Sequence, residues 1–266
     1  MRVEELSNHP LAQVRALRAE IAEVQARRGE HFRAVEGFRR ANAASRRWWQ
    51  WGLWWRHRAQ EAAMRALAPV VDPALHHELV RYEAGAAAEE RAAWELVARF
   101  DDRWALFSGY TNRRGEVDLV VVGPGGVWAV EVKGRGVRVH VDGDGWTYEK
   151  FDRYGNLVEE DDLSDRSGRS WGRQVRDVAD ALEGFLGRRG VPVSVYAAVV
   201  VMHERAEIGS VSDLSVLLSI GTGYLVEQIR HGPAVLSASR QADVERLIRQ
   251  DHDFHRKRRG RRRGVS

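Results

Sequence analysis

The residues of this sequence that could do chemistry stand at fixed spacing in two neighbouring β-rich segments. Asp118 lies in the first segment, 116–122, and Glu131 and Lys133 lie in the second, 127–133. Residues two apart on a strand point to the same side, so Glu131 and Lys133 share one face. A strand pairing that brings Asp118 alongside them would gather two carboxylates and one ammonium on a single patch.

The connection between the two segments predicts that pairing. Residues 123–126 read Gly-Pro-Gly-Gly, which is a hairpin signal between β-rich runs. If Val122 pairs with Val127, Asp118 lies directly opposite Glu131, with the Cβ atoms about 5 Å apart. A three- or five-residue loop would instead shift the register by one residue.

Two opposed carboxylates repel each other unless a positive charge lies between them. Mg²⁺ is the natural occupant, with Mn²⁺ as a substitute, because it prefers carboxylate oxygen and keeps several waters. Such a metal polarises a phosphate and lowers the pKa of a bound water. A lysine beside it can position or deprotonate the attacking water, or stabilise charge on the phosphate. The set therefore indicates phosphodiester hydrolysis.

Lysine is scarce in this chain, which adds weight to Lys133. The sequence has three lysines, Lys133, Lys150 and Lys257, against 39 arginines. Arginine is a poor substitute in such a site, because it stays protonated and presents a fork rather than a point charge. The alternative for a Glu-x-Lys pattern alone is an edge strand that ends in exposed charges. The register with Asp118, the glycine-rich turn and the scarcity of lysine favour function.

Two predicted helices each place one polar residue on an apolar stripe. Glu89 falls on the stripe of the helix predicted over 75–100, and Gln174 on that of the helix predicted over 169–186. A buried carboxylate needs a partner, and a partly buried glutamine there could contact the site. The alternative for each is a satisfied polar residue at the margin of the core. Glu90 lies about 100° away on the helix and is expected to be solvated.

The rest of the pattern predicts an α/β domain behind a helical region. Apolar residues spaced by three and four predict a long helix over 11–47, as a coiled coil or a helical hairpin. Residues 193–202 are nearly all apolar, as expected for a strand buried on both faces. Further expected elements are strands over 104–110, 137–141 and 146–149, a polar loop over 152–170, and a final helix over 241–255.

The segment 48–55, Trp-Trp-Gln-Trp-Gly-Leu-Trp-Trp, holds five of the ten tryptophans and has arginines on both sides. It is too short to span a bilayer. Its composition is typical of an anchor on the membrane surface, of a partner-binding helix that would join chains into an oligomer, or of a base-stacking surface. The alternative is a tryptophan cluster packed against the core.

The pI of about 9.7 arises at the C-terminal end of the sequence. Residues 256–263 hold seven of the 42 basic side chains and leave 35 against 38 acidic ones in the rest of the chain. Such a basic tail can bind phosphate backbones without sequence preference, and the alternative is a solvated disordered end. The residues expected to contact nucleic acid are Arg256, Lys257, Arg258, Arg259, Arg261, Arg262 and Arg263.

Several function classes are disfavoured by what the sequence lacks. It has no cysteine, which excludes disulfides and thiolate metal sites. The first ten residues lack the apolar stretch of a signal peptide and no segment is apolar enough to span a membrane, so we expect a cytoplasmic protein. The pairs His76–His77 and His252–His255 lack the surrounding acidic pattern of a zinc site. No Gly-x-x-x-x-Gly-Lys loop is present, which argues against ATP hydrolysis.

The strand and helix residues singled out above resemble the NERD family, the nuclease-related domains of the PD-(D/E)xK superfamily. The resemblance covers about residues 80–203 and lies in three blocks. The blocks are Gly85-Ala-Ala-Ala-Glu89 on a helix, the run from Val117-Asp118 through Glu131-Val-Lys133-Gly around the glycine-rich turn, and a helical Gln174. Related domains usually show a second glycine just before the helical glutamate. This chain has Ala88 there, so Glu89 and Glu90 both align with that glutamate.

The resemblance implies an α/β fold with a restriction-endonuclease-like αβββαβ core, in which a mixed sheet lies between helices, preceded here by the N-terminal helical region. It also implies Mg²⁺-dependent cleavage of DNA. By that analogy Asp118 and Glu131 bind the metal and Lys133 is the catalytic lysine. Glu89 completes the acidic set, and Gln174 orients water or substrate.

We therefore expect three parts, which are a helical, tryptophan-rich region at 1–70, a NERD-like nuclease core at 75–235, and a C-terminal helix with a basic tail at 236–266. The first hypothesis is a metal-dependent nuclease that hydrolyses phosphodiester bonds of DNA. The alternative is a catalytically silent NERD module that binds nucleic acid, or that is tethered to a membrane or a partner. A resemblance of fold alone does not establish activity.

Overall fold

The β-rich runs of the sequence form one mixed sheet of six strands. In sequence order these strands are β1 (Arg2–Glu5), β2 (Ala105–Thr111), β3 (Glu116–Gly123), β4 (Gly126–Lys133), β8 (Val195–Val201) and β10 (Leu217–Ile220). Their order in the sheet is β1-β2-β3-β4-β8-β10. Strands β2, β3 and β4 pair antiparallel, whereas β1–β2, β4–β8 and β8–β10 are parallel pairs. The predicted mixed sheet is confirmed.

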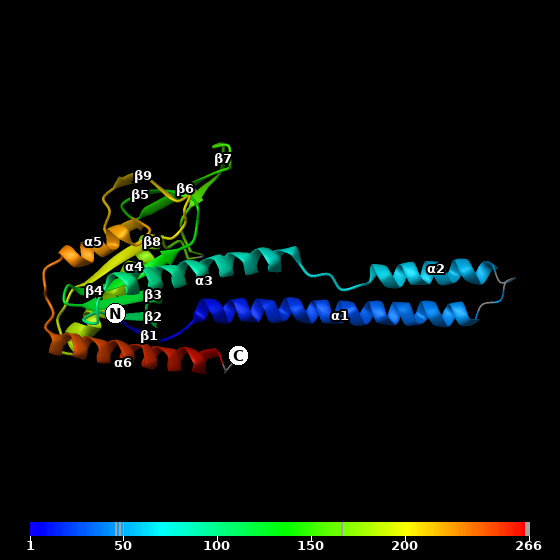
Figure 1. Cartoon of the computed structure of the whole chain (residues 1–266), viewed down its shortest axis with the longest axis horizontal. Coiled ribbons are helices and arrows are strands. Elements are labelled where there is room, and N and C mark those ends of the chain that lie inside the picture. The colour runs from blue at the N-terminus through cyan, green and yellow to red at the C-terminus, as the bar shows by residue number, and fades with distance from the viewer. Residues whose placement is uncertain (46, 48, 50, 166, 264–266) are drawn as a thin grey trace. The chain divides into compact units, whose positions relative to one another are not determined.

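This computed structural model describes residues 1–45, 47, 49, 51–165 and 167–263, with the backbone alone at 259–263 (Figure 1). Trp48 and Gln50 of the tryptophan-rich segment lie outside the described residues. So do the side chains of Arg259, Arg261, Arg262 and Arg263. The chain divides into two compact units, Met1–His9 with Ala84–Ser266, and Pro10–Glu83.

Helices cover both faces of the six-stranded sheet. α3 (Pro73–Arg99) and α5 (Gly223–His231) contribute to one hydrophobic cluster, and α4 (Trp171–Arg188) and α6 (Ala238–Arg263) contribute to the other. Residues that alternate along a strand enter opposite clusters, because successive side chains point to opposite faces. The order α3-β2-β3-β4-α4-β8 is the predicted αβββαβ arrangement, and the expected α/β, nuclease-like fold is confirmed (Figure 1).

A second sheet of four strands is formed largely between β4 and α4. Its strands are β5 (Arg138–Asp142), β6 (Gly145–Phe151), β7 (Leu157–Asp162) and β9 (Glu207–Ser212), in the order β7-β6-β5-β9. The expected outer hairpin is β5–β6. The polar loop expected over 152–170 was wrong in part, because β7 pairs antiparallel with β6 there. Every residue of β7 is exposed, so this strand shows no apolar alternation in the sequence.

The N-terminal strand β1 and the helix α6 share a group of polar contacts with β2. Arg2 donates to both carboxylate oxygens of Glu245 at 2.9 and 2.5 Å, and the Nε of Arg249 lies 2.9 and 2.8 Å from the two oxygens of Glu4. The buried Tyr110 hydroxyl donates to Asp251 at 2.6 Å. These residues, Arg2, Glu4, Tyr110, Glu245, Arg249 and Asp251, are called the paired cluster below.

The end of the last helix also differs from the prediction. α6 extends to Arg263, beyond the predicted end at His255, so the basic run begins inside the helix rather than after it. Arg256 lies near Asp253 at 3.2 Å, three residues earlier on the same helix. Charged contacts of this kind between residues three apart favour helix continuation, which a prediction based on apolar spacing omits.

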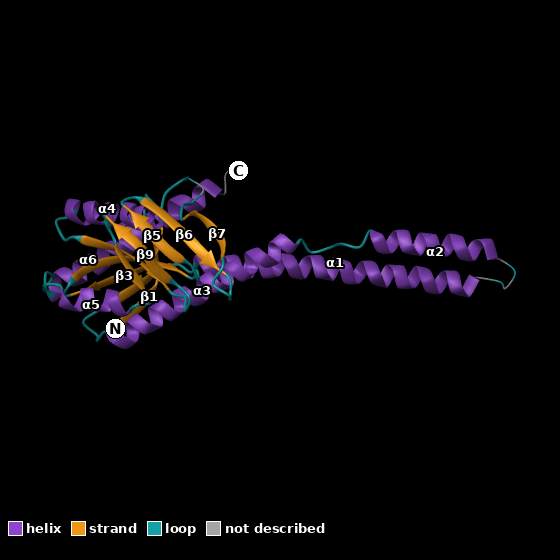
Figure 2. Cartoon of the chain, turned by 90° about the horizontal axis from the view of Figure 1, so that it is seen from above, coloured by secondary structure: helices purple, strands orange, loops and turns teal. Residues whose placement is uncertain are grey.

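The unit Pro10–Glu83 contains α1 (His9–Ser45), α2 (Trp51–Ala66) and the first turns of α3. His31 Nε2 lies 2.7 Å from the carbonyl oxygen of Met64, and the ring centroids of Phe38 and His57 lie 6.4 Å apart. Later residues of α1 thus meet earlier residues of α2, so the two helices form an antiparallel hairpin (Figure 2). Among the described residues, no helix has the length and apolar character needed to cross a membrane.

Candidate functional site

The turn between β3 and β4 sets the register of the site. Val122 pairs with Val127 and Gly123 with Gly126, which leaves Pro124 and Gly125 as a two-residue turn. A Cβ at Gly123 would lie 2.0 Å from the Trp104 ring, so this position has room only for glycine. The predicted register is confirmed from this turn to the pair Leu119–Val130.

Asp118 and Glu131 take the next position of that register, just beyond the last pair, Leu119–Val130. Asp118 departs from the ladder because its Oδ2 accepts a hydrogen bond of 2.6 Å from the backbone N–H of Val132. The carboxylate therefore lies against the neighbouring strand rather than pointing into solvent. This contact fixes one oxygen of Asp118 and ties β3 to β4 at the site.

The strand that carries Glu131 and Lys133 is central, with β3 on one side and β8 on the other. Glu131 is buried, and its neighbour Val132 is buried on the opposite face. The alternative of an edge strand that ends in exposed charges was therefore wrong. Two buried charged side chains on a central strand need a specific partner.

Lys133 supplies that partner. Its Nζ donates to Glu131 Oε1 at 2.6 Å, and the two side chains are 21% and 11% exposed. The same Nζ lies 5.5 Å from the centroid of the Trp171 ring. Trp171 is the first residue of α4, held by Ser170, whose side chain accepts the N–H of Arg173 as the helix N-cap. The lysine is thus confined between a carboxylate and an indole face.

The third carboxylate comes from α3. Ala88 on that helix is buried, and a Cβ on Gly134, directly after β4, would meet it at 3.1 Å, so helix and strand end approach closely here. Glu89, the next residue, is half-buried and its charge acts on Asp118 and Lys133. Glu90 is exposed. Of the two aligned glutamates, Glu89 is the one that interacts electrostatically with the site.

Negative charge exceeds positive charge in this site. Burial, followed by the charges of Glu131 and Glu89, raises the pKa of Asp118 well above its usual value. Burial and then Glu131 also raise the pKa of Glu89, to about 7. Burial alone would lower the pKa of Lys133, but the carboxylates around it outweigh that effect and raise the pKa. Asp118, Glu131, Glu89 and Lys133 are called the acidic site below.

One acidic residue near the site was missed by sequence reasoning. Glu116 lies two residues before Asp118 on β3, so both side chains belong to one face. Its charge also raises the pKa of Glu89, and Ser7 Oγ donates to its Oε1 at 3.3 Å. The alternation along β3 was the signal that could have identified it.

Gln174 has a partner of its own. Its side-chain Nε2 donates to the carbonyl oxygen of Arg169 at 2.8 Å, which holds the amide against the start of α4. The glutamine is half-buried, one turn after Trp171. In this conformation the amide nitrogen secures the helix start that positions Trp171 against Lys133.

The donor set fits a divalent cation bound by few protein oxygens. One oxygen each of Asp118 and Glu131 is engaged by Val132 and Lys133, and within the described residues the second oxygen of each accepts no hydrogen bond. In the same part of the chain, no group of three or more His, Asp or Glu side chains is spaced to hold a metal. Mg²⁺ commonly binds one or two carboxylates and keeps its waters, so two carboxylates are a sufficient protein contribution.

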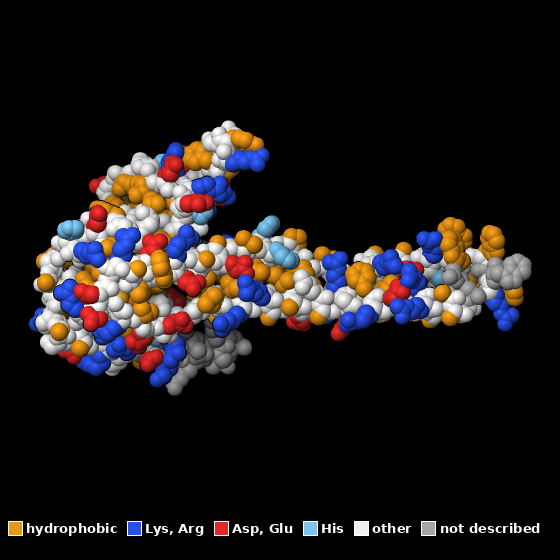
Figure 3. Space-filling view, viewed as in Figure 1, with side chains coloured by type: hydrophobic (Ala, Val, Ile, Leu, Met, Phe, Trp, Pro, Cys, Tyr) orange, Lys and Arg blue, Asp and Glu red, His pale blue; other side chains and the backbone are white. Residues whose placement is uncertain are grey.

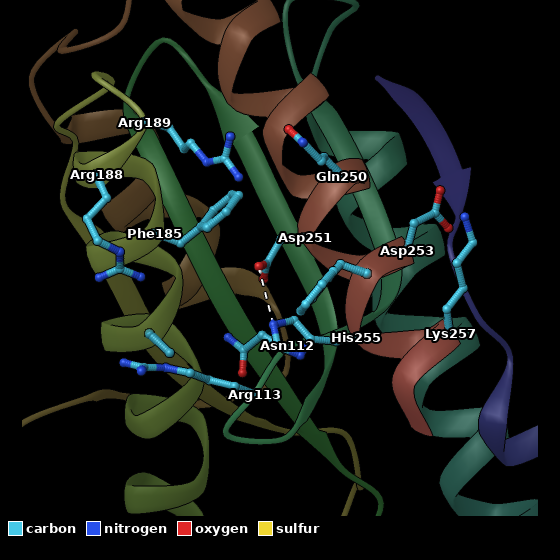
Figure 4. A pocket seen from close by; sticks show the side chains of 12 residues that line it. Asn112, Arg113, Phe185, Arg188, Arg189, Gln250, Asp251, Asp253, His255 and Lys257 are labelled. Atoms are coloured by element: carbon cyan, nitrogen blue, oxygen red, sulfur yellow. Dashed lines mark ion pairs between the residues drawn. The ribbon is translucent and has the colours of Figure 1, made fainter. Parts of the chain in front are cut away.

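A separate hollow of about 520 Å³ lies between α4 and α6 (Figure 4). Arg188 at the end of α4, Arg189 directly after it and Lys257 from α6 lie on its walls, together with Arg113 from the β2–β3 connection. In the described part of the chain none of these four side chains forms an ion pair with an acid. Two acids also line the hollow, and both are engaged elsewhere, Asp251 by Tyr110 and Asp253 by Arg256. The hollow therefore offers uncompensated positive charge.

Of the residues expected to contact nucleic acid, Lys257 lines this hollow, while Arg256 and Arg258 are exposed on the same helix. The histidine pair His252–His255 serves the fold instead. His252 is buried, and its Nδ1 accepts the N–H of Thr111 at 3.2 Å. His255 lies 3.5 Å from Asp251.

A mixed sheet between helices, with acids and a lysine on two adjacent strands, defines a nuclease-like α/β domain. Residues 84–202 match the family model described as nuclease-related domain, NERD. This segment belongs to that family, within the PD-(D/E)xK superfamily, and the resemblance read from the sequence is confirmed. It contains all four residues of the acidic site as well as Gln174. Searches of curated proteins and of solved structures gave no match.

Proposed function

We propose that this protein is a metal-dependent nuclease that hydrolyses phosphodiester bonds of DNA at the acidic site. The observation that carries the proposal is the charge imbalance of a buried cluster in which three carboxylates share one ammonium. Such an arrangement is unfavourable for folding on its own and is typical of sites that bind a cation or act on a charged substrate. It lies within the nuclease-related domain.

Each residue of the acidic site has a distinct task in this proposal. Asp118 and Glu131 would hold Mg²⁺ or Mn²⁺ through their free oxygens, and Glu89 adds negative charge beside them. The metal, when bound, polarises the phosphate and lowers the pKa of a bound water. Lys133, confined by Glu131 and Trp171, presents its ammonium to the phosphate charge or positions the attacking water.

Contacts to the nucleic-acid backbone are supported by the cationic hollow between α4 and α6. Arg113, Arg188 and Lys257 are not neutralised by acids of the described residues, so they can bind phosphates without sequence preference. Binding through these residues should weaken with salt, because counterions are released from the nucleic acid. Arg256, Arg258 and the basic residues at 259 and 261–263 would extend this contact.

The second candidate is a silent module that binds nucleic acid without cutting it. One observation favours it, which is that the described residues provide no metal group of three or more acidic or histidine side chains. Under this reading the cationic hollow would carry the function, and the acidic site would be a remnant of the fold. The two readings differ in whether loss of Lys133 changes activity or leaves it unaltered.

A cleavage assay on the full chain tests the proposal. Plasmid, linear duplex, single-stranded DNA and RNA would be incubated with Mg²⁺, Mn²⁺ or EDTA, beside Lys133→Ala and Asp118→Ala. Lys150→Ala is the matched control, because Lys150 also pairs with a glutamate on a strand, at 3.1 Å from Glu159, but is 50% exposed. Metal-dependent cutting that is lost in the two site variants and kept in the control supports the nuclease.

Absence of cutting on every substrate, with equal binding of DNA by all four proteins, contradicts the catalytic assignment and favours the silent module. If only RNA is cleaved and cleavage depends on the same residues, the site assignment stands and the substrate is RNA rather than DNA. Cutting that continues in EDTA would contradict the requirement for a metal ion.

A further inference from the structure

The closed end of the helical hairpin has an unusual composition. Between Glu36 and Glu61 the chain has five tryptophans, six arginines and no acidic residue. The contacts His31–Met64 and Phe38–His57 pair the two helices in antiparallel order, so the described residues between Phe38 and His57 belong to this end. Arg47, Trp49 and residues 51–58 are called the tryptophan tip below.

The tryptophans of the tip do not pack in a core. Trp51 is 75% exposed, Trp55 67% and Trp49 55%, and α2 has no buried residue at all. The sequence alternative of a tryptophan cluster packed against the core was therefore wrong for these residues. Figure 3 shows apolar side chains projecting from this end of the hairpin, with basic side chains beside them. A large apolar surface left exposed marks an interaction site.

Arginines accompany these rings closely. The guanidinium of Arg47 lies 5.5 Å from the Trp49 ring centroid, and that of Arg58 lies 4.8 Å from the Trp54 ring. Arg56 is exposed between them, and the described residues give it no acidic partner. Cation–π contacts let an arginine enter a less polar environment together with its ring. The tip thus combines indole rings with the positive charges of Arg56 and Arg58, which form no ion pair with a carboxylate of the described residues.

We infer that the tryptophan tip docks on the surface of an anionic lipid bilayer. Indole rings insert favourably at the level of the lipid headgroups, where an apolar body and a polar N–H are both accommodated. Arginines beside them are attracted to acidic headgroups. The helix would lie at the interface, with Trp51 and Trp55, one turn apart on α2, inserted together. This inference does not depend on the nuclease activity.

The other occupants fit the tip less well. A second copy of the tip would bring Arg56 and Arg58 of one chain against those of the other, which disfavours a symmetric contact. Nucleic-acid bases would stack on ring faces, and Arg47 and Arg58 each cover one face of Trp49 and Trp54, which reduces the stacking surface at these two rings. A lipid surface needs no open ring face and matches the charge.

Co-flotation of the full chain with vesicles tests the inference. Vesicles of phosphatidylcholine with phosphatidylglycerol would be compared with phosphatidylcholine alone, using the wild type and a Trp51→Ala/Trp55→Ala variant. Trp94→Ala is the matched control, because Trp94 is 69% exposed and lies on α3, far from the tip in sequence. We expect binding to the anionic vesicles to fall about tenfold or more in the double variant and to be unchanged in the control.

Two double variants with the same change of net charge test whether the position of the arginines matters. Arg56→Glu/Arg58→Glu should abolish the preference for phosphatidylglycerol, whereas Arg15→Glu/Arg33→Glu, on exposed positions of α1, should retain it. Quenching of tryptophan fluorescence by brominated lipid should follow the same order. Failure of the wild type to float, or equal flotation of all variants, overturns the inference. The inference is also overturned if Trp51 and Trp55 are required for a dimer, or for a complex with single-stranded DNA, and the protein does not bind vesicles.

Discussion

Two polar clusters beside the six-stranded sheet both contain aspartate and glutamate but differ in their charge balance. In the paired cluster, two arginines face two glutamates and a tyrosine faces an aspartate, all within hydrogen-bonding distance. In the acidic site, three carboxylates share Lys133, and two of them hold protons well above their usual pKa. Both clusters lie at the same sheet, so position alone does not separate them.

The difference indicates that one cluster serves the fold, and it supports the proposal that the other serves function. The paired cluster fastens β1 and α6 to β2, three elements that are far apart in sequence. Each of its three carboxylates accepts a hydrogen bond from an arginine or from the Tyr110 hydroxyl, so it needs nothing from outside the chain. The acidic site has one ammonium for three carboxylates, and folding tolerates this imbalance only because the surrounding sheet fixes its geometry. A ligand that supplies positive charge would complete it.

The largest expected effect is on cleavage. Lys133→Ala and Asp118→Asn should each reduce the cleavage rate by about 100-fold or more, since each removes a group that acts on the reacting phosphate. Glu245→Gln, in the paired cluster, should leave the rate of the folded protein within about twofold, because a change outside the site leaves the transition-state contacts intact. Initial rates on plasmid DNA measure both. A Glu245 variant as inactive as Lys133→Ala would remove the distinction between the clusters.

Stability should change in the opposite order. Glu245→Ala should lower the free energy of unfolding by about 2–3 kcal/mol, because it breaks hydrogen bonds to charged groups at a buried position. Asp118→Asn should leave the stability of the metal-free protein equal or higher, because it relieves repulsion with Glu131. Urea unfolding at neutral pH in EDTA measures both variants. Loss of stability in Asp118→Asn comparable to that in Glu245→Ala would contradict the assignment.

The pH dependence of stability follows from Glu89, whose pKa is raised from 4.5 to about 7. The folded state then holds a proton that the unfolded state has lost, so stability is highest below pH 4.5 and falls as pH rises towards 7. Thermal unfolding in EDTA between those values should show this fall, and Glu89→Gln should make it shallower, with the part that comes from the raised pKa of Asp118 retained. Glu90→Gln, one residue along and exposed, should retain it. Identical profiles for both variants would exclude Glu89 as the cause.

The smallest expected effect concerns one hydroxyl of the paired cluster. Tyr110→Phe removes the hydrogen bond to Asp251 and should destabilise the protein by about 1–2 kcal/mol. Its cleavage rate should match that of the wild type. Urea unfolding together with the plasmid assay checks both statements, and a defect in cleavage without a loss of stability would show that the two clusters are coupled.

The central strands and the acidic site could be predicted because their signals are local. The Gly-Pro-Gly-Gly turn sets the β3–β4 register, and alternation then assigns Asp118, Glu131 and Lys133 to one patch. The helical spacing of α3 was enough to single out Glu89. These signals act over a few residues each, so they survive without knowledge of the tertiary structure.

The remaining features depend on contacts between distant segments. β1 is four residues long and exists because it pairs with β2, about a hundred positions later in the chain. β7 is exposed throughout, so its strand character comes from pairing with β6 alone. The contact of Lys133 with Trp171 likewise follows from packing. No periodicity in the sequence could have indicated them.

The most direct test of the central claim is the binding of Mn²⁺ to the metal-stripped protein, followed by isothermal titration calorimetry. The wild type should bind Mn²⁺, Glu245→Gln should bind it with the same affinity, and Asp118→Asn should lose binding. That result would identify the acidic site as a metal site and would explain its excess of negative charge. Failure of the wild type to bind Mn²⁺, or unchanged binding by Asp118→Asn, would contradict the account.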